Sequence, residues 1–305
     1  MPPDALTHLA NRPERPARVV VMGAGGFVGG AILRRLQKDD VPVLGLTHAD
    51  VDLLRPDAAD RLASLLRPKD VFVAVSAMAP CKNTDMLRDN IIMARAMTSA
   101  AARADLAHVI NISSDAIYAD SSEPLTETSV AAPESLHGVM HLARELMFKA
   151  DIKTPIAMLR PTLIYGPGDP HNGYGPNRFM RLAAKGEPIV LFGKGEERRD
   201  HVYIDDVAEI AARVVYHRSE GALNVATGVV TSFHDIARLC VELSGGKSPV
   251  QETPRVAPMP HNGYRTFDTT TRQTAFPELR LTLLQEGLTK SYHLVGGARP
   301  PPAAA

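Results

Sequence analysis

The stretch Arg18-Val19-Val20-Val21-Met22-Gly23-Ala24-Gly25-Gly26-Phe27-Val28-Gly29 decides the fold of this chain. Residues 18–22 form a short apolar run typical of a buried strand, and residues 27–38 continue as a helix. Between them, Gly23, Gly26 and Gly29 follow a GxxGxxG spacing. In this spacing the first glycine permits a tight turn, the second lets the backbone approach a pyrophosphate, and the third lets helix and strand pack closely. The stretch therefore predicts a dinucleotide site whose diphosphate lies at the positive end of the helix.

The strand–helix alternation continues through the first half of the chain. Further strands are predicted at 41–46, 70–76, 108–113 and 155–159, and helices at 57–66, 86–104 and 134–150. Strands separated by helices of this length indicate a parallel sheet that is covered on both faces. After Pro161 the pattern becomes shorter and richer in glycine and proline, with helices near 177–184, 205–217 and 232–244 and an irregular stretch at 250–277. The predicted fold is α/β, a Rossmann-type doubly wound parallel sheet with a smaller C-terminal substrate-binding lobe.

These patterns divide the chain into four parts. A flexible N-terminal extension at 1–16 precedes the dinucleotide-binding domain at 17–165. A mainly substrate-binding lobe at 166–295 interleaves with that domain, and a flexible Pro/Ala tail occupies 296–305.

Composition excludes several classes of function. The chain has 305 residues, 45% hydrophobic and 22% charged, with a formal net charge of zero. Nothing in this balance attracts a polyanion or an anionic membrane, so neither nucleic acid nor membrane is an expected partner. No apolar run reaches the length of about 18 residues that a membrane span needs. Cys81 and Cys240 match no metal-ligand spacing and are expected to be reduced thiols in a cytoplasmic protein.

Most of the expected cofactor-binding residues lie just after the carboxyl ends of the predicted strands. The second strand ends at Leu46-Thr47-His48 and has no carboxylate at its tip, so the sequence leaves the choice between NAD and NADP open. Asp52 either contacts the adenosine or caps the loop before Pro56. The full predicted set is Gly23, Gly25, Gly26, Phe27, Val28, Thr47, Asp52, Leu53, Ser76, Ala77, Asn90 and His141.

Five later segments, read with the glycine turn, carry a family resemblance. They are Asn111-Ile112-Ser113-Ser114-Asp115-Ala116-Ile117-Tyr118, Glu123-Pro124-Leu125-Thr126-Glu127, Leu159-Arg160-Pro161-Thr162-Leu163-Ile164-Tyr165-Gly166-Pro167-Gly168, Arg199-Asp200-His201-Val202-Tyr203-Ile204-Asp205-Asp206-Val207-Ala208, and Leu223-Asn224-Val225-Ala226-Thr227-Gly228. In order and spacing the chain resembles the extended short-chain dehydrogenases, in the NAD-dependent epimerase/dehydratase family, over roughly 17–290. That resemblance implies an enzyme acting on nucleotide-activated sugars, favours NAD, and implies a homodimer formed by the helices at 86–104 and 134–150.

The catalytic motif departs from the family's pattern. The resemblance places the catalytic serine at Ser114, where the alternative is a strand-end serine that caps its own backbone. The family's Tyr-x-x-x-Lys falls on His137-Gly138-Val139-Met140-His141, and residues 119–164 contain no tyrosine that a shifted register could use. In the family the tyrosine is the acid/base, and the lysine lowers its pKa and holds the nicotinamide ribose.

Two histidines at i and i+4 lie on one face of a helix. His137 could shuttle a proton near neutral pH, and His141 could bond the ribose but cannot supply lysine's fixed positive charge. Three alternatives remain open: a chain that binds both ligands without turnover, a packing pair in a decayed site, or a zinc site, for which no third ligand is evident.

The resemblance implies a nucleoside-diphosphate sugar as the substrate. A planar guanidinium suits phosphate, which favours Arg199 and, further along, Arg265 as phosphate contacts. The other predicted substrate-binding residues are Ser114, Asp115, His171 and Asn177. The sequence does not choose between epimerisation, dehydration and reduction, and it does not name the base or the sugar.

Overall fold

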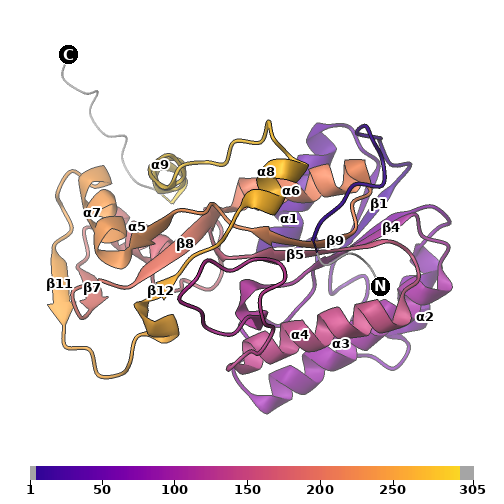
Figure 1. Ribbon diagram of the computed structural model, residues 1–305, viewed down its shortest axis with the longest axis horizontal. Coiled ribbons are helices and arrows are strands. Elements are labelled where there is room, and N and C mark those ends of the chain that lie inside the picture. Colours follow the sequence, from indigo (N-terminus) through magenta and orange to yellow (C-terminus); the bar gives the residue numbers. More distant parts are fainter. Residues whose placement is uncertain (1–4, 296–305) are drawn as a thin grey trace.

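The computed structural model describes residues 5–295, so the predictions for residues 1–4 and 296–305 lie outside the described part. Its centre is a six-stranded sheet in the order β2-β1-β3-β4-β5-β9 (Figure 1). All neighbouring strands are parallel. They are β1 (Val19–Met22), β2 (Val43–Leu46), β3 (Val71–Ala74), β4 (His108–Ile112), β5 (Ile156–Pro161) and β9 (Gly221–Val225). The predicted Rossmann-type fold class is confirmed.

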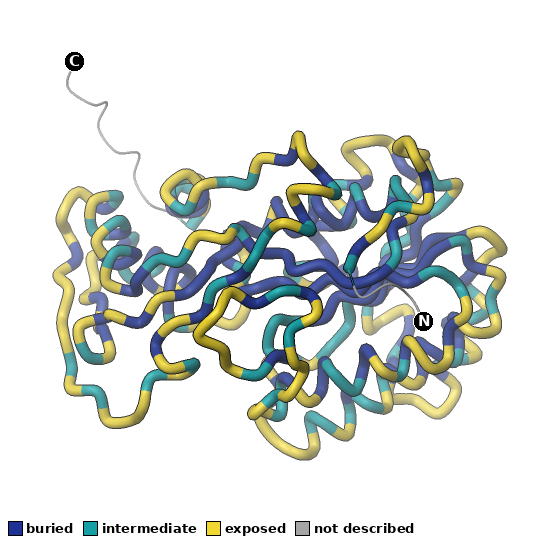
Figure 2. Tube along the Cα trace, viewed as in Figure 1, coloured by how far each residue is buried: buried dark blue, intermediate teal, exposed yellow. Residues whose placement is uncertain are grey.

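Helices cover both faces of this sheet. One face carries α1 (Phe27–Lys38) and α6 (Ile204–His217), and the other carries α2 (Ala58–Leu65), α3 (Thr84–Arg103) and α4 (Leu136–Asp151) (Figure 1). Successive strand residues point to opposite faces. Val19 and Val21 therefore join one core cluster and Val20 and Met22 the other. Because both faces are buried, the strands form the dark-blue layer through the middle of Figure 2.

The smaller lobe is built around β8 (Arg198–Tyr203), which pairs with β6 (Leu163–Tyr165), β10 (Val230–Ser232) and β12 (Tyr264–Arg265). It also contains α5 (Pro176–Lys185), α7 (Phe233–Leu243), α9 (Leu284–Leu294) and the strand pair β7 (Ile189–Phe192) and β11 (Val250–Thr253). The chain beyond residue 166 also returns to the large sheet through α6 and β9. The expectation of an irregular stretch at 250–277 was wrong, because this region supplies β11, β12 and α8 (Thr270–Ala275), which long-range pairing stabilises despite the prolines.

The predicted flexible extension at 1–16 was also wrong for its described part. Ala5 and Thr7 form bridges to Ala222 and Glu220 beside β9, and Leu6 is buried. His8 bonds the Ser219 hydroxyl and the Ala275 carbonyl, at 2.8 and 2.9 Å. Residues 5–10 thus cover the outer edge of the large sheet, a role that pairing sets and local composition does not reveal.

No helix within residues 5–295 is both long and apolar enough to cross a bilayer.

Two buried histidines should make the fold sensitive to acid. Burial lowers the pKa of His108 to about 4 and that of His201 to about 3. Both values lie below the ordinary 6.5 of the unfolded chain, so the unfolded state binds more protons once the pH falls below 6.5. Each histidine should then cost about 1.4 kcal/mol of unfolding free energy per pH unit, down to its folded pKa.

Denaturant titrations at pH 7.0, 6.0 and 5.0 (roughly one-unit steps across this window) measure that slope. His108→Gln should flatten it. The comparison separates His108 from the buried carboxyls Asp200 and Asp206, whose pKa values burial raises. Equal slopes in the wild type and His108→Gln would contradict the assignment.

Candidate active site

The glycine turn has the geometry that a dinucleotide needs. Gly23 adopts a φ of 101°, and a Cβ there would lie 2.8 Å from the Ser76 nitrogen. A Cβ on Gly29 would lie 2.1 Å from the Gly23 carbonyl oxygen, so only glycine lets α1 begin this close to the turn. Gly26 is the N-cap of α1, and no side chain caps it. The exposed Gly25 and Gly26 therefore lead to a helix N-terminus, flanked by half-buried Phe27 and Val28, that is open to an anion.

An acid does stand at the tip of β2, although the sequence order hides it. A turn brings the Asp50 nitrogen to the Thr47 carbonyl, at 3.1 Å. The Asp50 carboxylate then accepts hydrogen bonds from the Thr47 nitrogen and hydroxyl, both at 2.8 Å. These bonds lower the pKa of Asp50. The carboxylate of Asp52 instead accepts from the Leu54 nitrogen at 3.1 Å, which favours its loop-capping role, and Leu53 is buried.

The loop after β3 forms the next part of this edge. Ser76 contacts the glycine turn through its nitrogen, which bonds the Met22 carbonyl at 3.0 Å, and Ala77 follows half-buried. Asn90 on α3 is buried, and its amide bonds the Met78 nitrogen and carbonyl and the Met86 carbonyl at 2.8–3.0 Å. Asn90 is thus occupied in holding the loop, and the structure gives it a positioning role instead of a free polar group for the dinucleotide.

The contact between α4 and the turn after β4 supports the register of the His137-x-x-x-His141 motif. That turn is the 3₁₀ helix η1 (Asp115–Ile117). A Cβ on Gly138 would lie 2.1 Å from the Ala116 carbonyl oxygen and 2.5 Å from the Pro133 Cβ. Glycine at this position therefore lets the first turn of α4 rest directly on η1. The contact brings His137 to the strand-end region that also carries Ser114 and Asp115.

A weak hydrogen bond favours one tautomer of His137. The Cys81 backbone nitrogen donates to its Nδ1 at 3.4 Å, which favours the neutral ring with its proton on Nε2. Burial lowers the pKa of His137, against an opposing effect from the Asp115 carboxylate. Near neutral pH the ring is uncharged and presents a donor at Nε2. The bond from Cys81 is long and therefore weak, so little free energy opposes the other tautomer.

His141 lies one turn further along the helix. The two imidazole rings meet edge to face, with centroids 4.7 Å apart. His141 is buried and its Nδ1 has no hydrogen-bond partner. Burial, followed by the charges of His137 and Arg144, lowers its pKa well below 6.5. Within residues 5–295, no group of three or more His, Cys, Asp or Glu side chains is arranged to hold a metal ion.

Ser114 begins η1 and serves its own backbone. Its Oγ accepts from the Ala116 nitrogen at 3.1 Å, which is the capping arrangement that the sequence left open beside a catalytic one. The Ser114 hydroxyl also donates to the Asp115 carboxylate at 3.4 Å, a long and weak bond, and the side chain is partly exposed, so the hydroxyl can turn toward a substrate.

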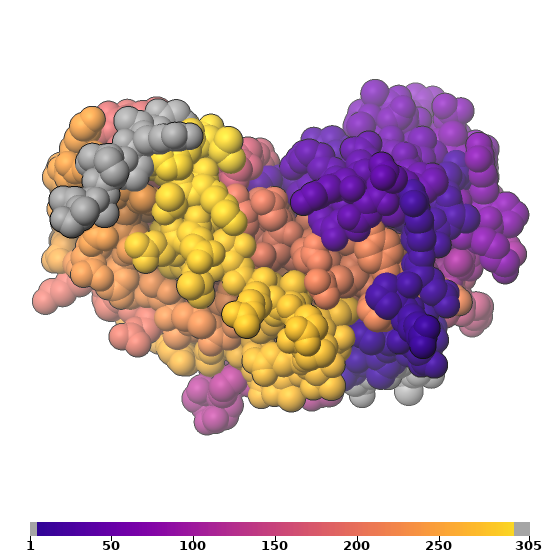
Figure 3. Space-filling model, turned by 90° about the horizontal axis from the view of Figure 1, so that it is seen from above, coloured from indigo at the N-terminus to yellow at the C-terminus, as the bar shows by residue number. Residues whose placement is uncertain are grey.

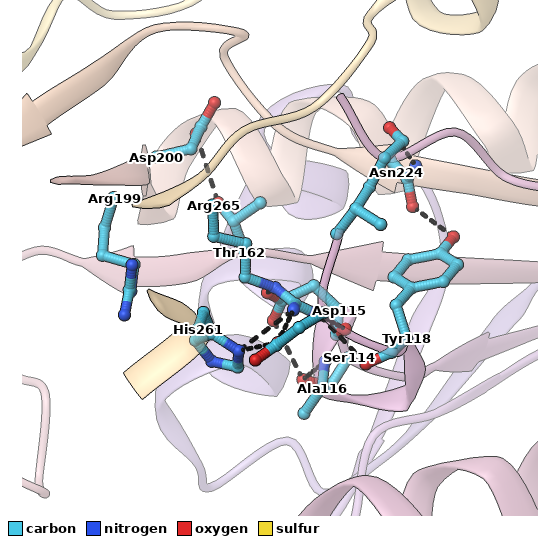
Figure 4. A network of polar contacts seen from close by, with 12 residues as sticks. Ser114, Asp115, Ala116, Tyr118, Thr162, Arg199, Asp200, Asn224, His261 and Arg265 are labelled. Atoms are coloured by element: carbon cyan, nitrogen blue, oxygen red, sulfur yellow. Dashed lines mark hydrogen bonds and ion pairs between the residues drawn. The ribbon is translucent and has the colours of Figure 1, made fainter. Parts of the chain in front are cut away.

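A buried ion pair fixes α4 against the sheet. Arg160 on β5 donates to both Glu145 oxygens at 2.9 and 2.8 Å and to the Tyr118 hydroxyl at 2.7 Å. Burial raises the pKa of Tyr118 to about 12, so this phenol stays protonated and donates to Asn224 at 2.7 Å. Figure 4 shows that Tyr118 hydroxyl directed at Asn224. The network accounts for Arg160 as a structural residue.

Both predicted phosphate-binding arginines are paired with carboxylates of the protein. Arg265 donates to Asp115 and Asp120, each at 3.1 Å, and to the Asp115 carbonyl at 2.7 Å. Arg199 pairs with Glu197 at 2.5 Å and also donates to the Pro260 carbonyl. Figure 4 shows Arg265 lying among Asp115, Ser114 and His261. In the sequence, Glu196 and Glu197 beside Arg199 offer a solvated pair as the alternative to a phosphate contact, and the structure pairs Arg199 with Glu197. The sequence missed Asp120, because it belongs to no motif that was singled out.

The remaining predicted substrate-binding residues, Asn177 and His171, differ in what they contact. Asn177 is buried, and its amide bonds the Gly166 nitrogen at 3.0 Å and the Ile164 carbonyl at 3.4 Å, so it fixes the end of β6. His171 is exposed in the following loop. Asp200, next to Arg199, accepts from the Thr227 and Gly228 nitrogens at 3.0 and 2.6 Å and ties β8 to the loop after β9. Figure 3, seen from above, shows an indented surface between the C-terminal lobe and the N-terminal half.

Comparison with known proteins identifies the family of the chain. The sequence pattern of the NAD dependent epimerase/dehydratase family matches residues 19–226. The chain belongs to this family. Among curated proteins it is 22% identical, over 89% of this chain and 96% of the relative, to an uncharacterized UDP-glucose epimerase of Bacillus subtilis.

Two solved structures illustrate the shared fold. A UDP-glucose 4-epimerase of Thermotoga maritima with UDP-glucose has a TM-score of 0.81 at 22% identity, covering 91% of this chain and 98% of that one. A GDP-L-fucose synthetase of Naegleria fowleri bound to NADP has a TM-score of 0.80 at 16% identity, covering 94% and 96%.

Proposed function

We propose that this protein is an NAD-dependent enzyme that epimerises, dehydrates or reduces a nucleotide-activated sugar, with His137 in place of the usual tyrosine. One observation carries the proposal: the contact at Gly138 sets His137 against η1, at the strand edge that also holds the glycine turn. The relatives named as UDP-sugar epimerases support the substrate class. A UDP-glucuronic acid 4-epimerase of Bacillus cereus in complex with NAD, similar to this chain in fold, supports the cofactor.

The glycine turn fits a nicotinamide dinucleotide, because the positions at which a Cβ would collide are glycines and the helix N-terminus has no side-chain cap. Gly25, Gly26, Phe27 and Val28 would hold the diphosphate, and Ser76 and Ala77 lie on the path toward His141. Such a cofactor supplies hydride transfer, which the protein's own side chains cannot perform.

Asp50 supports NAD over NADP. Its carboxylate is fixed at the tip of β2, where an acid bonds the ribose hydroxyls and repels a 2′-phosphate. We expect Asp50→Asn to narrow the preference for NAD over NADP roughly tenfold, the scale of a charge-assisted hydrogen bond. Calorimetry with NAD and NADP measures the ratio, and Asp57→Asn, on another exposed acid, serves as the control. A preference that is unchanged in Asp50→Asn would contradict the assignment.

His137 would contact the oxygen on the substrate carbon that is oxidised or reduced. In the tautomer favoured by Cys81, its Nε2 donates a hydrogen bond that polarises a carbonyl, as a neutral imidazole can. Taking a proton from a hydroxyl requires the other tautomer and the loss of the weak bond from Cys81. His141 stands where the family's lysine bonds the ribose, but its Nδ1 is buried, so a ribose would reach that nitrogen only after the ring turns. Ser114 would bond the same substrate oxygen as His137.

A diphosphate at Arg199 and Arg265 would have to compete with the protein's own acids. Two arginines face three carboxylates there: Asp115, Asp120 and Glu197. A phosphate oxygen offers the guanidinium the same kind of acceptor, so exchanging one anion for another costs little. The second candidate is a protein that binds a dinucleotide and a sugar nucleotide without turnover in a regulatory or structural role. It is supported by the neutral His137 and His141, which stand where the family carries its tyrosine and lysine.

A homodimer is part of the proposal. Ile92 on α3 and Val139 and Leu146 on α4 are exposed apolar side chains, 41%, 39% and 57% accessible. A second copy of these two helices would cover them.

The test is a thermal-shift screen of UDP-, GDP-, dTDP- and CDP-sugars with NAD present. We expect one class of base to raise the melting temperature and Arg199→Gln to remove that rise. No response to any nucleotide sugar, with stabilisation by an unrelated small ketone, would contradict the proposed substrate class.

A further inference from the structure

Arg144 is a buried cation without a carboxylate partner. It lies on α4, three residues after His141 and on the same buried face. It is 2% exposed, and its guanidinium forms no ion pair with any residue of the described chain. Burial alone lowers its pKa to about 10, so the side chain still carries its charge at neutral pH.

Three oxygens hold the guanidinium in place. Nε donates to Asn111 Oδ1, Nη1 to the Ser76 carbonyl and Nη2 to the Ala74 carbonyl, at 2.5, 2.5 and 2.7 Å. These acceptors are neutral and lie where β3 and β4 end. Ser76 is also the residue against which Gly23 packs. The charge therefore sits between the glycine turn and the helix that carries the two histidines.

A buried charge is costly, and a hydrophobic residue of similar volume is often at least as stable. The three hydrogen bonds and the Phe148 ring, whose centroid lies 5.5 Å from the guanidinium carbon, offset only part of that cost. A buried charge at the carboxyl edge of the sheet, beside the glycine turn, therefore indicates a role in ligand binding more than a role in stability. The two histidines beside it are neutral, so neither of them supplies a fixed positive charge to this edge.

We propose that Arg144 supplies the fixed positive charge of the dinucleotide site, one helical turn from the place where the family carries its lysine. Arg144 is a positioning residue that acts through the field at the nicotinamide and through His141. The inference rests on the proposed function. With this charge, the nicotinamide end of the site is positive although His137 and His141 are both neutral.

The field has a measurable direction. The oxidised nicotinamide ring is cationic and the reduced ring is neutral, so a nearby fixed cation disfavours the oxidised form. We expect the wild type to bind NADH roughly tenfold more tightly than NAD, the order for one charge several ångströms away in a protein interior. Arg144→Gln should bring this ratio near one, and Arg144→Lys should keep most of it. Arg272→Gln, which removes another buried arginine on α8, should leave the ratio unchanged.

A lysine at position 141 gives a sharper test. His141→Lys alone places two buried cations one turn apart, which should lower the melting temperature. The double variant His141→Lys/Arg144→Gln has one cation again, so it should melt above His141→Lys and recover the preference for NADH. If Arg144 has only a structural role, the ratio of NAD to NADH affinity should stay the same in all variants, and the lysine should restore neither that ratio nor the melting temperature.

Calorimetry with NAD and NADH on these variants decides between the two roles. A preference lost in Arg144→Gln and restored in the double variant supports the proposal. Equal affinity of the wild type for NAD and NADH overturns it, and this outcome needs no variant to fold. Failure of both dinucleotides to bind the wild type would instead overturn the proposed function.

Discussion

Alanine at position 29 is expected to abolish dinucleotide binding and to destabilise the fold. The added Cβ would lie 2.1 Å from the Gly23 carbonyl oxygen and 2.7 Å from its carbon, which are backbone atoms that no rotamer change can move. Either α1 or the turn must shift, and both hold the N–H groups that would face the diphosphate. We expect a loss of about 2–3 kcal/mol in unfolding free energy, as for an overpacked core. We also expect the affinity for NAD, measured by calorimetry, to fall beyond detection.

Gly25→Ala is the matched control for stability. A Cβ there would meet only the Thr47 methyl group, at 3.4 Å, which is ordinary contact. Its unfolding free energy should stay within about 0.5 kcal/mol of the wild type, as for a surface change. If Gly29→Ala bound NAD as the wild type does, the glycine turn would not be the dinucleotide site.

Replacing His137 by alanine is expected to lower the turnover rate by roughly 10²-fold or more, the contribution of a lost acid/base group. Affinity for both ligands should change little, because the glycine turn and the arginines remain. The wild-type rate should hold down to pH 6.5 and fall only below it, since burial lowers the pKa of His137. The measurement is kcat against pH on the nucleotide sugar that the thermal screen selects.

His234→Ala, at an exposed position on α7, should leave both the rate and its pH dependence unchanged. A His137→Ala variant with wild-type turnover would remove His137 from the chemistry, whatever ligands the site binds. The family's own pair, His137→Tyr with His141→Lys, should also be held back by Arg144 in this chain, because the lysine would add a second buried cation beside it.

Local chemistry explains why parts of this site could be predicted. The glycine turn is dictated by steric contacts between residues close in sequence, so its spacing identified it, whereas the resemblance to the family identified Gly138. The strand–helix alternation similarly predicted the parallel sheet, because both of its faces are buried.

Other parts depend on the tertiary structure. Asp50 reaches the tip of β2 only because the chain turns back at Thr47. Asn90 and Asn177 were predicted to bind ligands, but in the fold both amides hold loops. The sequence alone does not distinguish an asparagine that binds a ligand from one that holds a loop. The pairing of Arg265 with Asp115 and Asp120 joins segments 145 or more residues apart, which no local pattern reveals.

The central claim is that a neutral-histidine site changes the redox state of a bound nicotinamide with a nucleotide sugar. The most direct measurement is a single-turnover experiment, in which the protein is mixed with the selected nucleotide sugar and either NAD or NADH. Absorbance then follows the reduced nicotinamide, and NMR follows the sugar. We predict a transient or net change in the reduced nicotinamide together with a modified sugar in the wild type, and both changes roughly 10²-fold more slowly in His137→Ala. A wild type that binds both ligands and changes neither of them would contradict the enzyme and establish the binding protein.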